Sequence, residues 1–401
     1  MSLRDHKDTM TLSDAERLAG PLSFNLMIKP AGSLCNLGCS YCYYLDKAEI
    51  YSGSEPVMSI DMLETVIRKY IETCETPEVT FNWHGGEPLV LGKDFFRKVL
   101  EFERRYADGK VIHNTMQTNG ILLDSEWAAI LRAGNFLTGI SVDGPAEIHD
   151  RFRRDRRGGP TLDKVLRGIA VLQEAGAEFN TMTTINKASE GKGALVYEFL
   201  KSIGSHYMQF MPVLEHIKDG RIVPPGTPDS ETAPWSVSAT GFGQFMCDMF
   251  DQWIRHDVGK YFVGHFDAAL AGWCGVQPGT CAYAETCGGN AVIEHNGDVY
   301  MCDHFVYPEF KLGNIREKSL KEMLTSAEMI RFGISKRNSL PVKCLKCQWV
   351  RLCNGECPKH RFSVTDDGQE GLNALCRGYE MFYSHTVPHM KRMRDYLLQE
   401  R

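Results

Sequence analysis

Fourteen cysteines are the residues of this sequence best suited to do chemistry, and twelve of them stand in two groups. The first group places Cys35, Cys39 and Cys42 within eight residues, and the second runs from Cys274 to Cys376. In a reducing compartment such cysteines are more often metal ligands or redox thiols than disulfides. We therefore expect most of them to bind metal.

The three-cysteine group, Cys35-x3-Cys39-x2-Cys42, is one ligand short of a closed site. Four cysteines complete a tetrahedral zinc site or a fully ligated iron–sulfur cluster. A cluster held by three would keep one iron open for an outside ligand. A partial zinc site is the alternative for these three residues taken alone.

The second group contains eight cysteines in a regular order, which are Cys281, Cys287, Cys302, Cys344, Cys347, Cys353, Cys357 and Cys376. Eight thiolates make two complete sets of four, which suit two closed clusters or two structural zinc sites. Of the other three cysteines, Cys74 and Cys247 stand among apolar helical residues, and we expect them to be buried structural thiols. We assign no role to Cys274.

The elements that must position these groups alternate between strand and helix. Short apolar runs predict strands over residues 24–29, 78–84, 111–118, 136–142, 179–185 and 207–212. Amphipathic patterns predict helices over residues 61–74, 93–105, 125–133, 162–175 and 194–203. This alternation is typical of βαβ units on a parallel sheet. Six units without a Gly-x-Gly-x-x-Gly turn favour an α/β partial (β/α)6 TIM-like barrel over a Rossmann sheet.

Polar motifs follow the predicted strands at their carboxyl ends, where barrels carry their chemistry. They are the three-cysteine group, Gly85-Gly86-Glu87, Gln117-Thr118-Asn119 and Ser141-Val142-Asp143. We expect them to meet at one mouth of the barrel.

The chain divides into five expected parts, which are an N-terminal extension (1–23), the barrel (24–235), a helical connector (236–273), a small cysteine-rich domain (274–385) and a C-terminal helix (386–401). Residues 218–236 are rich in Pro, Gly and charge, which predicts a long loop. A helical pattern spans about 239–271. Metals would replace the missing core of the cysteine-rich domain.

The composition excludes several classes of function. A net charge of -6 over 401 residues gives no general attraction to nucleic acid or to an anionic membrane. The N-terminus lacks the apolar core of a signal peptide, and no apolar run reaches the roughly 18 residues of a spanning helix. We expect a cytoplasmic protein with no nucleic-acid or membrane partner.

The three-cysteine group, the preceding Tyr41 and the Gly85-Gly86-Glu87-Pro88 turn resemble the radical S-adenosylmethionine (SAM) superfamily over the first 215 or so residues. The resemblance implies that Cys35, Cys39 and Cys42 hold a [4Fe-4S] cluster whose open iron binds SAM. Cleavage of SAM would then give a 5'-deoxyadenosyl radical.

The same resemblance implies five SAM-binding residues, which are Tyr41, Gly86, Ser141, Arg153 and Leu214. A glycine pair at the turn leaves no Cβ in the way of the methionine amine. Arg153 would pair with the SAM carboxylate as a bidentate fork. Arg154 is the alternative, because the run 151–157 holds five arginines.

Seven of these cysteines, from Cys287 to Cys376, have a spacing that resembles the SPASM domain, an auxiliary-cluster module of radical SAM enzymes that modify peptides. Cys281 precedes them by six residues and completes the eight. The resemblance implies two further [4Fe-4S] clusters, three in total. The first set of four is Cys281, Cys287, Cys302 and Cys357, and the second set of four is Cys344, Cys347, Cys353 and Cys376. Because both clusters are fully ligated, electron transfer and structural support are their remaining roles.

The length, all eleven ligand cysteines and the pair Cys302-Asp303 are similar to the anaerobic sulfatase-maturating enzymes. The similarity implies a SAM-dependent oxidoreductase that removes a hydrogen from Cβ of a cysteine or serine in Cys/Ser-x-Pro-x-Arg and yields Cα-formylglycine. Its implied partners are an unfolded or nascent sulfatase polypeptide and an electron donor such as flavodoxin or ferredoxin.

The reaction also needs a base for the thiol or hydroxyl proton. In the family the aspartate at the position of Asp303 is the proposed base, and His304 is a second candidate. We expect Tyr44, His84 and Gln117 to hold the substrate backbone.

Two rival functions remain open at this point. One is a peptide-modifying enzyme that forms thioether or carbon–carbon crosslinks, although only 34 residues precede Cys35, too few for the precursor-binding domain that many such enzymes carry. The other is an electron-transfer protein with three clusters, which leaves the Gly85–Pro88 turn unexplained. The choice between a cysteine and a serine substrate also stays open.

Overall fold

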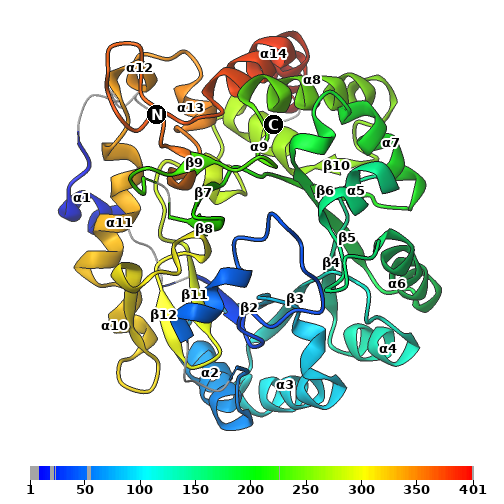
Figure 1. The fold of residues 1–401 in the computed structure, drawn as a ribbon. Coiled ribbons are helices and arrows are strands. Elements are labelled where there is room, and N and C mark those ends of the chain that lie inside the picture. Colours follow the sequence, from blue (N-terminus) through cyan, green and yellow to red (C-terminus); the bar gives the residue numbers. More distant parts are fainter. Residues whose placement is uncertain (1–8, 19–21, 23, 52–55, 225, 400–401) are drawn as a thin grey trace.

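The computed structural model describes residues 9–18, 22, 24–51, 56–224 and 226–399. A ten-stranded sheet with the order β10-β6-β5-β4-β3-β2-β1-β11-β12-β13 forms the centre of the molecule. This sheet curls into an incomplete barrel with helices on its outer face (Figure 1). The expected α/β partial barrel is confirmed.

The six expected strands all form, and they agree with the prediction to within one residue at each end. They are β1 (Asn25–Lys29), β2 (Glu78–Trp83), β3 (Val111–Thr118), β4 (Phe136–Ser141), β5 (Phe179–Ile185) and β6 (Tyr207–Pro212). Neighbouring strands pair in parallel throughout. Their carboxyl ends therefore lie at one edge, as the polar motifs require.

The helices between these strands cover the outer face of the barrel (Figure 1). They are α2 (Ile60–Thr73), α3 (Lys93–Tyr106), α4 (Ser125–Ala133), α5 (Ala146–Phe152), α6 (Leu162–Ala175) and α7 (Gly193–Ser202). In α2, Ser59 caps the first turn by accepting from the Met62 amide. Its buried residues, Met62, Leu63, Val66, Ile67, Tyr70 and Ile71, repeat at helical spacing and face the sheet.

The segment expected to be one helical connector contains two helices, α8 (Ala239–His256) and α9 (Gly264–Trp273). Gly259 lies between them with a φ of +76°, and β10 (Phe262–Val263) pairs with β6 before α9 begins. The left-handed glycine and the edge strand explain why the apolar pattern does not continue as one helix.

The expected long loop is also partly ordered. It contains a three-stranded antiparallel sheet of β7 (His216–Lys218), β8 (Arg221–Val223) and β9 (Glu231–Thr232). The Asp219-Gly220 turn between β7 and β8 has positive φ at both residues, a geometry that favours a tight hairpin.

The cysteine-rich region continues the barrel sheet. Its strands are β11 (Asn290–Glu294), β12 (Asp298–Tyr300) and β13 (Lys311–Asn314), and β11 pairs in parallel with β1. Four helices follow, α10 (Leu320–Leu324), α11 (Ala327–Asn338), α12 (Val342–Leu345) and α13 (Val350–Cys353). The two parts of the chain that we expected to be separate domains thus share one sheet.

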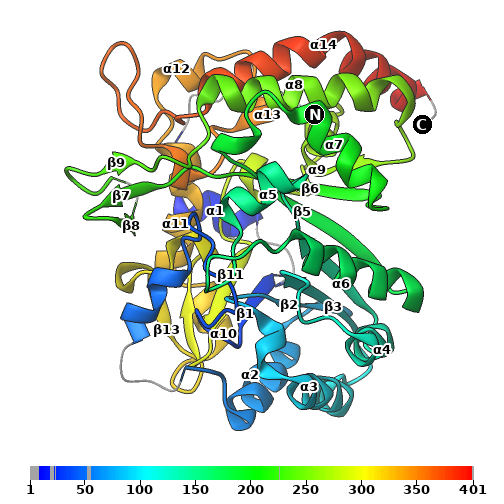
Figure 2. The ribbon, with the colours of Figure 1, turned by 45° about the vertical axis from the view of Figure 1, so that its right-hand side comes forward.

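The C-terminal helix α14 (Cys376–Gln399) packs along α8 (Figures 1 and 2). It begins ten residues before the expected boundary at 386, so a ligand cysteine opens the helix. A Cβ on Gly378 would lie 2.3 Å from the carbonyl oxygen of Ala239. The glycine therefore permits the close approach of the two helices.

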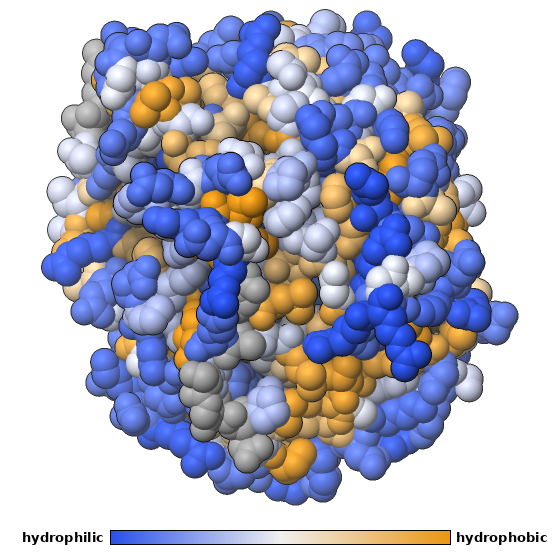
Figure 3. All heavy atoms as spheres, viewed as in Figure 1, coloured by the Kyte–Doolittle hydropathy of each residue, from blue (hydrophilic) through white to orange (hydrophobic). Residues whose placement is uncertain are grey.

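The expected N-terminal extension contains the helix α1 (Leu12–Leu18), which lies against α11. Residues 1–8, 19–21 and 23 of this extension lie outside the described part of the chain. Among the helices of the described residues, none has both the length and the apolar composition that a bilayer crossing requires. On the face viewed in Figure 1, apolar side chains gather near the middle and hydrophilic ones surround them (Figure 3).

Candidate active site

The three-cysteine group lies in the loop that follows β1. Burial raises the pKa of Cys39 to about 12, although the charge of Arg153 acts to lower it. The neighbouring Cys42 and Cys35 raise this pKa further. Burial likewise raises the pKa of Cys35 to about 11. The three thiols thus share one partly buried space, where a bound cationic centre would favour their thiolate forms.

The glycine turn after β2 packs directly on this cysteine loop. The Gly86 amide donates to the Gly32 carbonyl at 2.8 Å. A Cβ on Gly86 would lie 2.1 Å from the Leu34 carbonyl oxygen. Contact with the cysteine loop is therefore a physical reason for glycine here, besides the open approach to SAM that the sequence suggested.

Glu87 ties the glycine turn to the end of β3. Its carboxyl group accepts from the Thr118 hydroxyl at 2.6 Å, from the Asn119 amide at 2.7 Å and from the Leu89 amide at 3.1 Å. Burial raises its pKa to about 7 in spite of these hydrogen bonds. Glu87 belongs to the Gly85-Gly86-Glu87-Pro88 turn, but the sequence alone indicates no role for its carboxyl group.

Arg153 and Tyr41 meet on a third residue, Asp143. The Arg153 Nε donates to Asp143 Oδ2 at 2.9 Å, and the Tyr41 hydroxyl donates to the same oxygen at 2.5 Å. Arg154 is exposed and donates to the Gly158 carbonyl. Arg153, rather than Arg154, lies beside the cysteine group. Sequence reasoning assigned no role to Asp143, although it ends the Ser141-Val142-Asp143 motif.

The other expected SAM contacts lie at strand ends. Ser141, at the end of β4, accepts from Gln117 Nε2 at 2.9 Å. Leu214 follows β6 and is buried in the main core. Both remain predicted SAM contacts.

Asp303 reaches from the cysteine-rich region toward the barrel strands. It follows Cys302 in a short 3-10 turn (Asp303–Phe305). Its Oδ1 lies 2.5 Å from Lys29 Nζ, and its Oδ2 accepts from the Tyr43 hydroxyl at 2.5 Å. Lys29 ends β1, so the first barrel strand and the three-cysteine loop both hold this carboxylate.

The charge of Lys29 keeps Asp303 ionised. Burial acts to raise the Asp303 pKa, but the Lys29 ammonium, together with His84 and His304, outweighs it and holds that pKa well below its usual range. The carboxylate is therefore available as an acceptor at any pH near neutrality.

His84 stands beside this ion pair in a defined tautomer. Its Nδ1 accepts from the Gly85 amide at 2.8 Å and lies 3.2 Å from Lys29 Nζ. Burial, together with Lys29, lowers the pKa of His84 to about 3, so the ring is neutral. With Nδ1 used as an acceptor, the proton belongs on Nε2.

A cavity of about 280 Å³ lies inside the barrel below His84. Its lining is rich in amide side chains, which are Asn25, Asn82, Gln117, Asn180, Gln209 and Asn290. They come from six strands, because alternate residues of a strand face the same side. Two of the residues expected to hold substrate, His84 and Gln117, line the cavity.

Tyr44, the third residue expected to hold substrate, does not line this cavity. Its hydroxyl donates to Glu294, and its ring lies 4.2 Å below the Lys29 ammonium. Tyr44 therefore supports Lys29, and its expected contact with the substrate stays a prediction.

His304, the second candidate base, turns away from Lys29. Its Nδ1 lies 3.4 Å from the Cys357 sulfur, and burial lowers its pKa to about 3. The geometry favours Asp303 over His304 as the base.

The first set of four cysteines converges in the cysteine-rich region. Burial raises the pKa of Cys302, and Cys281 and Cys287 add to it. Burial also raises the pKa of Cys357, to which Cys302 and Cys287 contribute. These mutual effects indicate that the four thiols lie within electrostatic range of one another.

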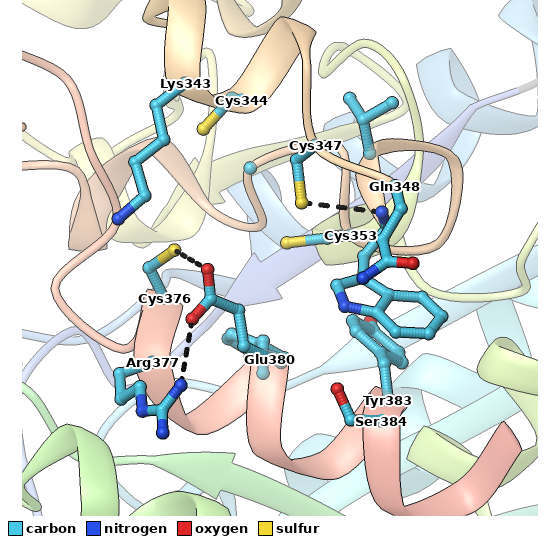
Figure 4. A pocket seen from close by; sticks show the side chains of 14 residues that line it. Lys343, Cys344, Cys347, Gln348, Cys353, Cys376, Arg377, Glu380, Tyr383 and Ser384 are labelled. Carbon is cyan, nitrogen blue, oxygen red and sulfur yellow. Dashed lines mark hydrogen bonds and ion pairs between the residues drawn. The ribbon is translucent and has the colours of Figure 1, made fainter.

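The second set of four lines a cavity of about 420 Å³ near the surface. The sulfur atoms of Cys344, Cys347, Cys353 and Cys376 face a common space (Figure 4). Lys343 and Arg377 stand at its rim and are exposed. The second set thus faces one space, and both sets of four remain the predicted ligands of the two auxiliary clusters.

The three remaining cysteines belong to neither set. Cys74 and Cys247 are buried, at 3% and 8% exposure, as expected of structural thiols. Cys274 caps the end of α9.

Family comparisons agree with this arrangement. Residues 30–199 match the Radical SAM superfamily, and residues 281–348 match an iron-sulfur cluster-binding domain, SPASM. The fold and the cysteine sites together define a radical SAM enzyme with an appended cluster-binding region.

Individual relatives show which family of radical SAM enzymes the chain belongs to. The chain is 45% identical to a serine-type anaerobic sulfatase-maturating enzyme of Bacteroides thetaiotaomicron, over 94% of this chain and 92% of the relative. A cysteine-type enzyme of Clostridium novyi is 32% identical, over 91% and 96%. A solved structure of native anSMEcpe with bound AdoMet and Cp18Cys peptide matches with a TM-score of 0.84 at 29% identity, over 94% and 100%. The chain belongs to the anaerobic sulfatase-maturating enzymes.

Membership in this family decides between the metal sites and between the reactions that the sequence left open. The protein is a SAM-dependent oxidoreductase with [4Fe-4S] clusters, so the zinc sites and the plain electron carrier are set aside. A crosslinking activity is set aside for the same reason.

Proposed function

We propose that this chain oxidises a residue within Cys/Ser-x-Pro-x-Arg of a sulfatase to Cα-formylglycine, and that serine is the residue it prefers. The observation that carries the proposal is the Asp303 carboxylate, held ionised by Lys29 beside an amide-lined cavity in a radical SAM barrel.

The oxidation of serine to an aldehyde removes one hydrogen atom from Cβ, one proton from the hydroxyl group and one electron. When bound, SAM and the three clusters supply the radical that takes the hydrogen atom and the acceptor for the electron. The protein must supply a base for the proton and must hold the side chain toward it.

Asp303 is the base that the geometry supports. Its carboxylate is ionised, it follows a ligand of the first set of four, and Lys29 and Tyr43 fix both oxygens. Loss of the Cβ hydrogen makes the neighbouring hydroxyl more acidic, so a weakly basic carboxylate suffices. Lys29 stabilises the carboxylate until the proton arrives.

The amide-lined cavity suits an extended peptide. Asn and Gln side chains offer one acceptor and two donors each, which match the N–H and C=O groups of a substrate backbone. The His84 Nε2 proton adds a donor at the end of the cavity nearest the carboxyl ends of the strands. A cavity of about 280 Å³ inside a barrel admits a chain segment but no folded domain. This supports an unfolded or nascent sulfatase as the substrate.

Serine is favoured by the pattern of similarity. Serine-type relatives are 45% and 34% identical to this chain, and cysteine-type relatives are 32% and 31% identical. A competition experiment tests the preference with an equal mixture of a serine and a cysteine peptide, anaerobic holoenzyme, SAM and reductant. We expect the serine peptide to convert first in mass spectra, and an alanine peptide serves as the blank. Prior conversion of the cysteine peptide would contradict the preference.

The proposal also includes an electron donor such as flavodoxin or ferredoxin. The exposed cations Lys343 and Arg377 beside the second set of four would suit such an acidic partner. Weaker turnover of Lys343→Glu with flavodoxin, but not with dithionite, is the expected result.

A further inference from the structure

Two partly or fully buried cations, Lys336 and Arg361, lie between the two sets of four cysteines. Neither side chain belongs to the SAM site or to the Asp303 site. Their partners and their surroundings indicate a role toward both auxiliary clusters.

Lys336 projects from α11 and is fully buried. Its ammonium donates to the carbonyl oxygens of Cys281 and Ala282, each at 2.7 Å. It therefore holds the backbone of a ligand from the first set of four. Burial lowers the pKa of Lys336, and the neighbouring Cys287 thiol opposes that effect.

Arg361 fills a cradle of backbone carbonyls. Its guanidinium donates to the carbonyl oxygens of Asn354 at 2.6 Å, Gly355 at 2.9 Å and Glu356 at 3.1 Å, and to that of Lys336. Residues 354–356 connect Cys353 of the second set to Cys357 of the first.

This connecting segment has an unusual backbone. Asn354, Gly355 and Glu356 all have positive φ, at 46°, 68° and 54°. Such a conformation costs free energy in non-glycine residues and persists only where the surroundings hold it. A Cβ on Gly355 would lie 2.6 Å from an Arg361 nitrogen, so the glycine makes room for the guanidinium.

Neither cation has a carboxylate in an ion pair among the residues that the structure describes; their hydrogen-bond acceptors are backbone carbonyls and the Ser339 hydroxyl. The nearby Glu356 carboxylate is engaged by His360 and Asn373, each at 2.8 Å. The Glu356 carboxylate acts on both cations as a counter-charge, and so does Cys287 of the first set. Cys353 and Cys344 of the second set act on Arg361. Each cation therefore stands beside cysteines that would carry the negative charge of a bound cluster.

We propose that Lys336 and Arg361 form a cationic bridge between the two auxiliary clusters and raise the reduction potentials of both. The proposal rests on the two sets of four as cluster ligands, and it does not depend on the substrate or on Asp303. A cluster gains negative charge when it is reduced, so a fixed positive charge nearby favours the reduced state. Lys336 acts mainly on the first set, and Arg361 acts on both.

The test is an EPR-monitored redox titration of anaerobically reconstituted holoenzyme, with iron content measured in parallel. In Lys336→Gln, which keeps a carbonyl-binding donor without the charge, we expect reduction of the first auxiliary cluster to become at least tenfold less favourable. That corresponds to about 59 mV for a one-electron couple. Lys336→Arg keeps the charge and should stay near the wild-type potential. Lys321→Gln removes an exposed cation on α10 that pairs with Glu75, and it should leave both auxiliary potentials near the wild-type values.

Each outcome either supports or overturns the proposed cationic bridge. Full iron and an unchanged potential in Lys336→Gln would overturn the proposal. Lys336→Gln could lose iron. In that case, Lys336→Arg with full iron and an unchanged reduction potential would show that the first auxiliary cluster needs the positive charge at this position. Loss of iron in both variants would show that Lys336 only shapes the loop. Because no substrate is present, failure of the proposed function would not alter these readings.

Discussion

At the scale of single residues, the ion pair between Asp303 and Lys29 joins the two halves of the chain. Asp303 comes from the cysteine-rich region, and Lys29 ends the first barrel strand. Tyr43, one residue beyond the last cysteine of the three-cysteine group, binds the other carboxylate oxygen. The proposed base is therefore held from two directions, which is the preorganisation that proton transfer needs.

Asp303→Asn should uncouple SAM cleavage from product formation. Asparagine keeps the shape of the side chain but cannot accept the proton, so formylglycine should fall by roughly 10²–10⁴ while 5'-deoxyadenosine still forms. The loss should be steeper for a serine peptide, because an alcohol holds its proton more tightly than a thiol does. Mass spectrometry of the peptide and chromatography of the nucleoside measure the two products.

Asp298→Asn is the matched control for this variant. Asp298 lies on β12 and pairs with Lys311, away from the cavity, so near-normal turnover is expected. Near-wild-type turnover of both peptides by Asp303→Asn would show that Asp303 is only a turn residue.

Lys29→Met should change the pH dependence of the reaction. In the wild type, the Lys29 charge holds the Asp303 pKa low, so the base stays ionised as the pH falls. Without that charge, burial raises the Asp303 pKa against weaker opposition, and activity should be lost at a higher pH on the acid side. A pH–rate profile measures the shift, and Lys29→Arg, which keeps the charge, should behave like the wild type. An identical acid limb in Lys29→Met would contradict this role.

At the scale of elements, the glycine turn after β2 and the cysteine loop after β1 support each other. Gly86→Ala would place a methyl group 2.1 Å from the Leu34 carbonyl oxygen and displace the loop that carries the three cysteines. We expect loss of SAM cleavage and of iron from this site, with the other iron retained. Gly279→Ala, where a Cβ meets no atom within 4 Å, is the control and should keep both. Full SAM cleavage by Gly86→Ala would show that the loop adapts.

The elements of the barrel could be predicted because their patterns are local. Each strand is a short apolar run, and each helix buries a face at regular spacing, as α2 does. The SPASM region could be recognised because cysteine spacing is a property of the sequence itself, while the division of its cysteines into two sets follows from the resemblance and stays a prediction.

Other features depend on contacts between distant segments and left no local signal. The pairing of β11 with β1 joins residues about 265 positions apart. Asp143 acquires its role only because Tyr41 and Arg153 fold onto it. The cradle around Arg361 needs three consecutive positive φ angles, and two of those residues are not glycine.

At the scale of the whole molecule, the barrel and the cysteine-rich region form one catalytic unit. They share the central sheet, and Glu215, after β6, forms a buried ion pair with Lys359 at 2.5 Å. The Asp303 site lies between the three-cysteine group and the first set of four.

Three [4Fe-4S] clusters predict about twelve irons per chain in anaerobically reconstituted protein. Replacing Cys35, Cys39 and Cys42 by alanine should remove roughly one third of the iron and all SAM cleavage, since the other two sets are independent of this loop. Iron analysis and nucleoside chromatography measure both quantities. About four irons per chain in the intact protein would contradict two auxiliary clusters.

The most direct test of hydrogen removal at Cβ uses a Ser-x-Pro-x-Arg peptide with deuterium at the serine Cβ. Holoenzyme, SAM and reductant are incubated with it under anaerobic conditions, and both products are analysed by mass spectrometry. We expect deuterium in 5'-deoxyadenosine and an aldehyde in the peptide, which aldehyde-specific labelling confirms. Unlabelled 5'-deoxyadenosine beside an unchanged peptide, or a crosslinked peptide without an aldehyde, would contradict the proposed oxidation to formylglycine.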